Sequence, residues 1–590
     1  MLKNALDLVK AKLSLAVTEF QRNRSRYVMG AALFILAAVT VFWNFQHMGL
    51  SHWDEYYFIE TAAASMNVGW GSFQPWDPPL FPFLLSIMFR VFGLQDYVAV
   101  ATSGLMALLL CALTFWWTKR EYDFSTAIVS ALILASIAMF IFYAKMALSD
   151  MTFTFFFSAA IFAYVGALRR RSDWAFLVAG FVLACTLATK YNGFQPIIVI
   201  LISIPFSCLP IFRGEAAFRK KVNSYLRQLL GFMAGLWVSL APVLLFLIVF
   251  LAFLGRPFAP SLVALTGLAR DFIPRLNEGF TFLVLVVFPT KSVVNSPQLF
   301  VSAGFYGHVL TEFVGLPTLA LAVVGGVRGI LKRQMNVVLL IIWVGFVFIY
   351  FSSLPGLYPR VILPLVVPLA VLAGQATLWC ATTIVRFLRG LDFRLGQKRL
   401  GASLKAGLVI AVVLSNLYFS IPAITNTHSA YREAAEFIIA NVPNGDLVWC
   451  KSQIVLWAYL NMFGKNVRLS NDISQISQAY AVVLDFTAKS SPDYPQIQTQ
   501  ISQMTLAATI RNDAGTINMI DSPTPVSGFQ QFESDPDRMS IQIYLQSSPS
   551  VSNSPSQSYS TAQAETLANL FSSMIAAQKD QIQSRGECVG

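Results

Sequence analysis

Charged residues are scarce in this sequence. Only 12% of the 590 residues are Asp, Glu, Lys or Arg, whereas 56% are hydrophobic and 14% are aromatic. Soluble globular domains carry about 25% charged residues. The shortage of charge therefore excludes an ordinary soluble protein, and the composition predicts an integral membrane protein.

Several motifs are also missing. No His or Cys cluster has the spacing of zinc ligands, and no Gly-rich nucleotide-binding loop is present. The first apolar run has no Ala-x-Ala-like cleavage site after it, which predicts an uncleaved first helix. The net charge of +12 would suit nucleic acid. However, Lys and Arg gather in short loops between apolar runs, as the positive-inside rule expects, so nucleic acid is not an expected partner.

The apolar runs have the length that a bilayer requires and predict about eleven membrane-spanning helices. The run at 80–92 is too short and contains proline, so we expect an interfacial element there, and part of 280–287 is considered as a re-entrant segment. The predicted spans are 27–45, 97–117, 125–144, 151–168, 174–189, 195–212, 229–254, 308–327, 336–354, 361–384 and 406–423.

The charges of the loops predict an orientation. With the N-terminus in the cytoplasm, every inside loop is basic, including those around Lys119, Arg170 and Arg394, and the opposite loops hold few Lys or Arg. An odd number of spans then places the C-terminal part outside, where strands at 447–450 and 481–484 and a helix at 431–440 predict a small α/β domain.

The expected fold is an all-α polytopic membrane domain followed by a small C-terminal α/β soluble domain. Residues 1–26 form the expected cytoplasmic segment, and 27–425 the transmembrane domain, with its first outer loop at 46–96. The α/β domain is expected at 426–545, and 546–590 reads as a Ser/Pro/Gln-rich linker with a terminal helix. Cys450 and Cys588 would share an oxidising compartment, where the two thiols can form a disulfide if their geometry allows it.

The stretch that follows the first span is unusual, because carboxylates beside a bilayer are costly and tend to be kept for function. Asp54 and Glu55 open a segment whose apolar residues recur at helical spacing, which predicts a short interfacial helix. Both acids would lie in its first turn and face the water side of the membrane boundary. These acids could equally serve as a helix cap and as charges that favour a helix N-terminus.

The Asp54-Glu55 pair, the interfacial helix and the following Pro78-Pro79-Leu80 resemble the GT-C glycosyltransferases. The protein O-mannosyltransferases and the aminoarabinose or galacturonic acid transferases that modify lipopolysaccharide are the most similar groups. The resemblance covers roughly residues 1–440. It implies an inverting transfer of a sugar from an undecaprenyl-like polyprenyl phosphate to lipid A, polysaccharide or protein. It also implies reaction on the extracytoplasmic face. A bacterial inner membrane is expected rather than the endoplasmic reticulum, because the predicted soluble domain is small and no retention signal ends the sequence. A nucleotide-sugar donor is not expected.

The resemblance implies a role for Asp54, and the charges that a sugar transfer requires suggest roles for the other ionisable residues. Asp54 corresponds to the first-loop general base, and Glu55 and Asp150 would orient the acceptor or raise the proton affinity of the base. Lys190 and Arg360 would hold the donor phosphate, with Lys145 and His52 as weaker candidates. Each of these cations lies near a span end, where basic side chains also extend to the interface for structural reasons. Asp150 could simply cap a helix.

One departure from the family concerns the residues before the two prolines. Relatives that act on lipid A often have Glu-Lys there, whereas this chain has Trp76-Asp77. The missing Lys leaves phosphate binding to Lys190, Arg360 or Lys145, or to a divalent metal held by Asp77. No cofactor is certain, and the metal ligands stay unknown.

Two other functions remain open from the sequence: a transporter or flippase of lipid-linked sugars, and a membrane anchor for the outer domain. Transporters tend to place ionisable residues near the middle of the membrane. Here the spans are nearly free of charge and the ionisable groups lie at one face. This distribution favours surface chemistry, with membrane lipids, the lipid-linked donor and an envelope acceptor as partners.

Overall fold

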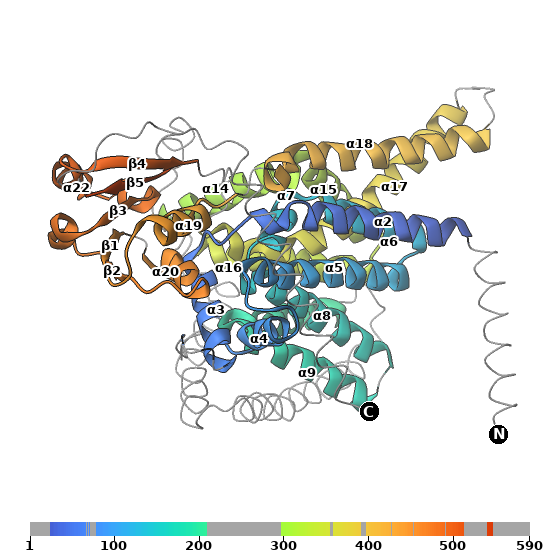
Figure 1. Cartoon of the computed structure of the whole chain (residues 1–590). Helices are drawn as coiled ribbons and strands as arrows, with labels where there is room; N and C mark the ends of the chain where they lie inside the picture. Colours follow the sequence, from blue (N-terminus) through green and yellow to red (C-terminus); the bar gives the residue numbers. More distant parts are fainter. Residues whose placement is uncertain are drawn as a thin grey trace, which may run out of the picture. The chain divides into compact units, whose positions relative to one another are not determined.

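The structure, a computed structural model, describes residues 24–66, 68, 70, 78–170, 172–208, 297–353, 358–390, 397–425, 428–451, 453–489, 491–511 and 540–546. The described residues up to Leu545 belong to one compact unit (Figure 1). The helices of the apolar part are α2 (Arg24–Phe42), α3 (Trp53–Met66), α4 (Leu80–Phe92), α5 (Asp96–Glu121), α6 (Phe124–Ser136), α7 (Ala138–Ala144), α8 (Ser149–Arg170), α9 (Asp173–Thr189), α10 (Gln195–Cys208), α14 (Pro297–Leu310), α15 (Leu316–Leu331), α16 (Met335–Ser352), α17 (Val366–Gly390) and α18 (Gln397–Thr425).

Every predicted span except 229–254 coincides with a described helix or with a helix pair. Both 229–254 and 280–287 lie outside the described residues. Seven helices in the described ranges are long and apolar enough to cross a membrane, and one bent pair would make an eighth. The segments Trp174–Thr189, Asn192–Ser203 and Leu80–Phe92 are apolar but shorter. The expected polytopic helical fold is therefore confirmed.

One predicted span, at 125–144, is broken. Helices α6 and α7 meet at 65°, and Ile137 between them is extended with φ −73° and ψ 127°. A break inside a membrane protein is tolerated where neighbouring side chains satisfy the freed backbone groups. Ser420 of α18 donates a 2.7 Å hydrogen bond to the carbonyl of Ser136, and Asn416 of α18 donates to its hydroxyl. The break is thus held by polar side chains of another helix.

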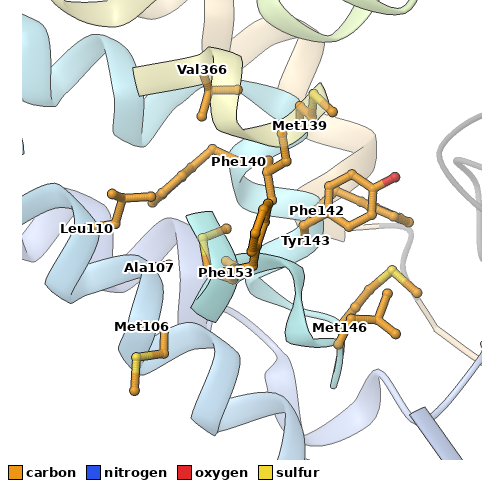
Figure 2. Packing of buried hydrophobic residues seen from close by; sticks show 14 of the residues in the cluster. Met106, Ala107, Leu110, Met139, Phe140, Phe142, Tyr143, Met146, Phe153 and Val366 are labelled. Carbon is orange, nitrogen blue, oxygen red and sulfur yellow. The ribbon is translucent and has the colours of Figure 1, made fainter. Parts of the chain in front are cut away.

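The short helix α7 lies in the middle of the main hydrophobic core. Met139 and Phe140 of α7 gather with Leu110 of α5, Phe153 of α8 and Val366 of α17 (Figure 2). All of these side chains are at most 3% exposed. Helix α7 leads directly to Lys145 and then to the start of α8, so this packing fixes the chain segment that precedes Asp150.

Close helix packing in the bundle depends on glycine. A Cβ atom on Gly325 of α15 would overlap the backbone carbonyl of Leu372 of α17. A Cβ on Gly374 of α17 would likewise overlap the side chain of Ser130 of α6. Small residues allow helix backbones to approach closely in membrane proteins. These contacts join α15, α17 and α6 into a tight group.

The C-terminal part contains a five-stranded mixed sheet with the order β2-β1-β3-β5-β4. Strand β1 is parallel to both β2 and β3, whereas β5 is antiparallel to both β3 and β4. The predicted strands at 447–450 and 481–484 are confirmed as β1 and β3. The elements are α19 (Tyr431–Asn441), β1 (Leu447–Cys450), α20 (Gln453–Met462), β2 (Arg468–Ser470), β3 (Ala481–Leu484), α21 (Phe486–Lys489), α22 (Tyr494–Ile501), β4 (Thr505–Ile510) and β5 (Ile541–Leu545).

Alternation along the strands supplies two cores. Trp449, Val482 and Leu484 face a small cluster with α22, whereas Val448, Cys450 and Val483 belong to the main core. The thiol of Cys450 is fully buried, and its Sγ lies 3.8 Å from a carboxylate oxygen of Asp485. Cys588 lies outside the described residues, so its pairing with Cys450 stays a prediction.

Candidate active site at the ends of four helical elements

Four of the predicted site residues converge in an alternating row of charges. Arg360 Nη1 lies 2.5 Å from Asp54 Oδ2 and 4.0 Å from Asp150 Oδ2. On the far side of Asp150, Lys190 Nζ lies 2.5 Å from Oδ1. The order of the row is thus Asp54, Arg360, Asp150, Lys190, and we refer to these four residues as the charged cluster.

Each member of the charged cluster lies at the end of a helical element. Asp54 is in the first turn of α3, and Asp150 is in the first turn of α8. Lys190 follows the last residue of α9, and Arg360 is the second residue of the 3₁₀ helix Pro359–Leu365. Successive antiparallel helices bring such ends to one side of a bundle. Residues up to 306 positions apart therefore meet.

Lys190 is positioned by an abrupt turn. The amide of Gly193 donates a 2.8 Å hydrogen bond to the carbonyl of Lys190. A Cβ atom on Gly193 would lie 2.6 Å from the backbone of Thr186, so only glycine fits there without displacement. The ammonium group of Lys190 lies 5.8 Å from the ring centre of Phe153. Sequence reasoning missed Phe153, because it looks like any other apolar residue of a span.

The charged cluster is only partly open to solvent. The side chain of Asp150 is 2% exposed, compared with 15% for Arg360, 22% for Lys190 and 26% for Asp54. Burial acts to raise the pKa of the Asp54 carboxyl, but the surrounding cations, led by Arg360, hold the pKa below its ordinary value. Asp54 is consequently ionised throughout the physiological pH range. Within the described residues, Asp150 Oδ2 has no hydrogen-bond donor, although it faces Arg360.

Glu55 has a different environment from Asp54. Its Oε2 accepts hydrogen bonds from the amides of Ser51 and His52, and its Oε1 accepts one from the amide of Ala147. The side chain is 1% exposed, so the expectation that both acids face water fails for Glu55. Burial raises the pKa of the Glu55 carboxyl, while the three N–H donors oppose that rise. Glu55 ties the start of α3 to the segment before Asp150.

Glu55→Gln is therefore expected to act on stability first. Gln has one acceptor oxygen and an NH₂ group that would face an N–H donor, so at least one buried amide loses its partner. The loss should be about 1–3 kcal/mol, measured by denaturant titration in detergent. Activity should fall in parallel with the folded fraction. Full stability with abolished turnover would instead assign Glu55 a direct chemical role.

Three weaker candidates are placed differently. Lys145 Nζ donates to the carbonyls of Trp43 and Ile424, at 3.0 and 2.8 Å, and thereby caps the ends of α2 and α18. The structure does not bring Lys145 into the charged cluster. His52 is buried beside the charged cluster, and its Nδ1 lies 3.9 Å from Asp54 Oδ2. Asp77 lies outside the described residues, and among those that are described no three His, Cys, Asp or Glu side chains group as metal ligands would.

The C-terminal α/β domain is joined to the loop that leads to Asp54. The hydroxyl of Tyr459 accepts a 2.5 Å hydrogen bond from the amide of Leu50 and donates to Asp96 at 3.1 Å. Burial and the adjacent Asp96 carboxylate raise the pKa of Tyr459 well above its ordinary value, so the phenol stays protonated. Ser429 adds a second bridge, because its Oγ donates to the carbonyl of Leu50. These contacts fix the chain four residues before Asp54.

Tyr459→Phe should lower stability by about 1–3 kcal/mol, because the amide of Leu50 and the buried Asp96 each lose a partner. It should also reduce turnover by loosening the approach to Asp54. Tyr418→Phe is the matched control, since Tyr418 is 70% exposed. Unfolding transitions and transfer rates of both variants make the comparison. Equal behaviour of the two variants would show that the hydroxyl of Tyr459 does not hold the loop.

Comparisons with known proteins agree with this architecture. The dolichyl-phosphate-mannose-protein mannosyltransferase family profile matches residues 76–234, a segment that includes Asp150 and Lys190. The dolichyl-phosphate-mannose–protein mannosyltransferase 4 of Schizosaccharomyces pombe is 26% identical over 204 residues. That alignment covers 30% of this chain and 26% of the relative, so the matched part is about a quarter of the relative's length.

Two solved structures share the fold. The apo oligosaccharyltransferase of Archaeoglobus fulgidus superimposes with a TM-score of 0.54 at 12% identity, over 80% of this chain and 71% of that protein. The same organism's oligosaccharyltransferase AglB, in complex with an inhibitory peptide and a dolichol-phosphate, gives a TM-score of 0.50 at 14% identity, over 86% and 74%. At the level of the fold, these matches confirm the expected resemblance to the GT-C glycosyltransferases.

Proposed function

We propose that this protein is a membrane glycosyltransferase that moves a sugar from a polyprenyl phosphate to an acceptor hydroxyl on the extracytoplasmic face. The observation that carries the proposal is the charged cluster, which sets two carboxylates beside two cations at one end of the helix bundle. The matched segment and the oligosaccharyltransferase fold support the same class of reaction. The acceptor is lipid A, a polysaccharide or a protein, and a bacterial inner membrane is the proposed location.

In the proposed step, the carboxylate of Asp54 takes the proton from the acceptor hydroxyl. The acceptor oxygen forms a bond to the anomeric carbon from the face opposite the phosphate. The bond from the anomeric carbon to the phosphate oxygen breaks, and the phosphate leaves with the electron pair, so the configuration inverts. Arg360 and Lys190 stabilise the charge that develops on the leaving phosphate.

The ion pairs of the charged cluster imply an exchange when the donor binds. Arg360 lies against Asp54, and Lys190 lies against Asp150, so each cation already has a carboxylate partner. A donor phosphate would draw both cations toward itself. Asp54 would then lose its closest positive charge, its pKa would rise, and it would become a stronger base. Donor binding and activation of the base are coupled in this proposal.

Arg360→Gln provides a test through pH. Arg360 is the largest cause that lowers the pKa of Asp54, whereas burial raises it, so removing the guanidinium should raise that pKa. Asp54 works in the ionised form, so the acid limb of kcat/KM should move to higher pH in the variant, since kcat/KM reports the free enzyme. The measurement is kcat/KM between about pH 4 and 8. If the acid limb does not move, the group that titrates in kcat/KM is not influenced by Arg360, which contradicts its assignment to Asp54.

The activity itself is tested with purified full-length protein and a labelled polyprenyl-phosphate sugar. Transfer of label to an added acceptor extract, lost in a variant of the charged cluster, is the expected result. Movement of the intact labelled lipid between leaflets of a vesicle, without transfer, would instead indicate a flippase. Absence of both activities toward a range of lipid-linked sugars would overturn the proposal.

A further inference from the structure

A second site lies at the other end of the bundle. Arg360 precedes α17, whereas a pocket of about 500 Å³ is lined by residues from the later part of that helix, including Gln375, Trp379 and Arg386. The end of α15 contributes Arg328 and Lys332, and α18 contributes Lys405. The start of α6 completes the lining. By the charges of the loops, this end of the bundle faces the cytoplasm.

The pocket is strongly positive. Arg328, Lys332, Arg386 and Lys405 all line it, and the acidic residue in its lining is Asp123. The carboxylate of Asp123 already accepts hydrogen bonds from Thr126, at 3.0 Å to the amide and 2.7 Å to the hydroxyl. This carboxylate caps α6, so it offers little compensation for four cations. The pocket therefore favours an anionic ligand.

Two buried polar groups border the pocket. Gln375 is 7% exposed, and its side chain pairs with the hydroxyl of Tyr122, which also lines the pocket. Nε of Arg328 is buried, and among the described residues it has no hydrogen-bond acceptor. Buried donors in folded proteins are nearly always satisfied, so Arg328 has hydrogen-bonding capacity left for an acceptor from outside the chain.

The walls of the pocket are fixed in place. The guanidinium carbon of Arg328 lies 5.3 Å from the ring centre of Trp379, which holds the charge over the aromatic face. Gly325, one turn earlier on α15, allows α15 to contact the backbone of α17 directly. Arg328 and Gln375 are thus presented by two helices that cannot easily separate.

We propose that this pocket binds a phosphate ester, and specifically the headgroup phosphate of an anionic glycerophospholipid in the cytoplasmic leaflet. Basic pockets between transmembrane helices on that side bind lipid headgroups. A phosphodiester supplies two acceptor oxygens and one negative charge, which match the guanidinium of Arg328 and the surplus of cations in the lining. The volume also suits a headgroup. The proposal does not depend on the proposed glycosyl transfer.

The test measures binding of soluble short-chain lipids to the purified full-length protein by calorimetry. Dihexanoyl phosphatidylglycerol should bind, whereas dihexanoyl phosphatidylcholine, whose headgroup has no net charge, should bind much more weakly. Inorganic phosphate is the third arm. Binding of phosphatidylglycerol but not phosphate supports the lipid source, and equal binding of inorganic phosphate that competes with the lipid supports a soluble phosphate ligand. Absence of binding by all three overturns the proposal.

Variants locate the site. Arg328→Gln with Lys332→Gln should weaken phosphatidylglycerol binding by about tenfold to a hundredfold, because charge-assisted hydrogen bonds are lost. The matched control is Lys119→Gln with Arg120→Gln, which removes two cations from the same face outside the pocket lining. Equal weakening in the control would mean that general surface charge attracts the lipid, and it would refute the pocket.

Discussion

Asp54→Asn is expected to lower turnover by about 10²–10⁴-fold, the usual contribution of a positioned general base, while the protein stays folded. Asn keeps the shape of the side chain and can still accept a hydrogen bond from Arg360. It cannot take the proton of the acceptor. Asp54 lies in the first turn of α3, so the loss of its charge should cost the helix only about 0.3–1 kcal/mol.

Single-turnover transfer, with the donor prebound, is the measurement that isolates this effect from donor binding. Asp446→Asn is the matched control, because within the described chain the side chain of Asp446 makes no hydrogen bond or ion pair. Transfer by folded Asp54→Asn within a fewfold of the wild type would remove Asp54 from the role of base. Asp150 would then be the stronger alternative, because Oδ2 has no hydrogen-bond donor whereas both oxygens of Glu55 are occupied.

Lys190→Met is expected to damage both stability and donor binding. It leaves the carboxylate of Asp150, which is 2% exposed, with Arg360 at 4.0 Å as its nearest remaining cation. Breaking a buried ion pair from one side costs up to about 3–5 kcal/mol. Loss of a charge-assisted contact to the donor phosphate should weaken binding by about tenfold to a hundredfold.

The double variant Lys190→Met with Asp150→Asn separates these two effects. It removes the unpaired charge, so stability measured by denaturant titration should return toward that of the wild type. Binding of a short-chain polyprenyl phosphate should stay weak, because the cation is still missing. Asp150→Asn alone releases Lys190 from its partner and should bind the phosphate at least as tightly as the wild type. Recovery of donor binding in the double variant would contradict a phosphate contact by Lys190.

The variants of Asp54, Asp150 and Lys190 test whether each cation pairs with a carboxylate of the cluster or with the donor phosphate. In the ligand-free row, the cations compensate carboxylates, and the charges of the four residues cancel. In the proposed reaction, the donor phosphate competes with those carboxylates for Arg360 and Lys190. If the cations paired only weakly with the carboxylates, the buried negative charge of Asp150 would be uncompensated. If they paired too strongly, the donor phosphate could not displace the carboxylates. The partial exposure of Lys190 and Arg360 leaves room for the exchange.

Within the described residues, the C-terminal α/β domain constrains the position of Asp54 without contacting the charged cluster itself. Tyr459 and Ser429 hold Leu50, and the chain then runs through His52 into the first turn of α3. Arg432 of α19 reaches the same region through Asp96 at 3.4 Å. An insertion or truncation in the C-terminal α/β domain should therefore be transmitted to Asp54 through this loop and through the stacking of Trp457 of α20 on Tyr56 of α3.

Much of the fold follows from local features of the sequence. Long apolar runs predicted the spans, because a bilayer demands a fixed length of apolar helix. Short runs of apolar residues predicted β1 and β3, whereas β2, β4 and β5 escaped detection because they are short or half exposed. The break at Ile137 had no sequence signal, since neither proline nor glycine lies there. It exists because Ser420 and Asn416, almost 300 residues away, satisfy the freed groups.

For the site, the sequence alone determined which ionisable groups lie at helix ends on one side of the membrane. Only the tertiary structure decided which of them meet. Asp54, Asp150, Lys190 and Arg360 form one row of charges, whereas Glu55 and Lys145 bind backbone amides and carbonyls instead. The sequence could reach this far because the spacing of apolar residues and the charge of a loop depend only on residues that are close together in the chain. The partner of a buried charge is set by whichever polar group the packed chain brings within a few ångströms of it.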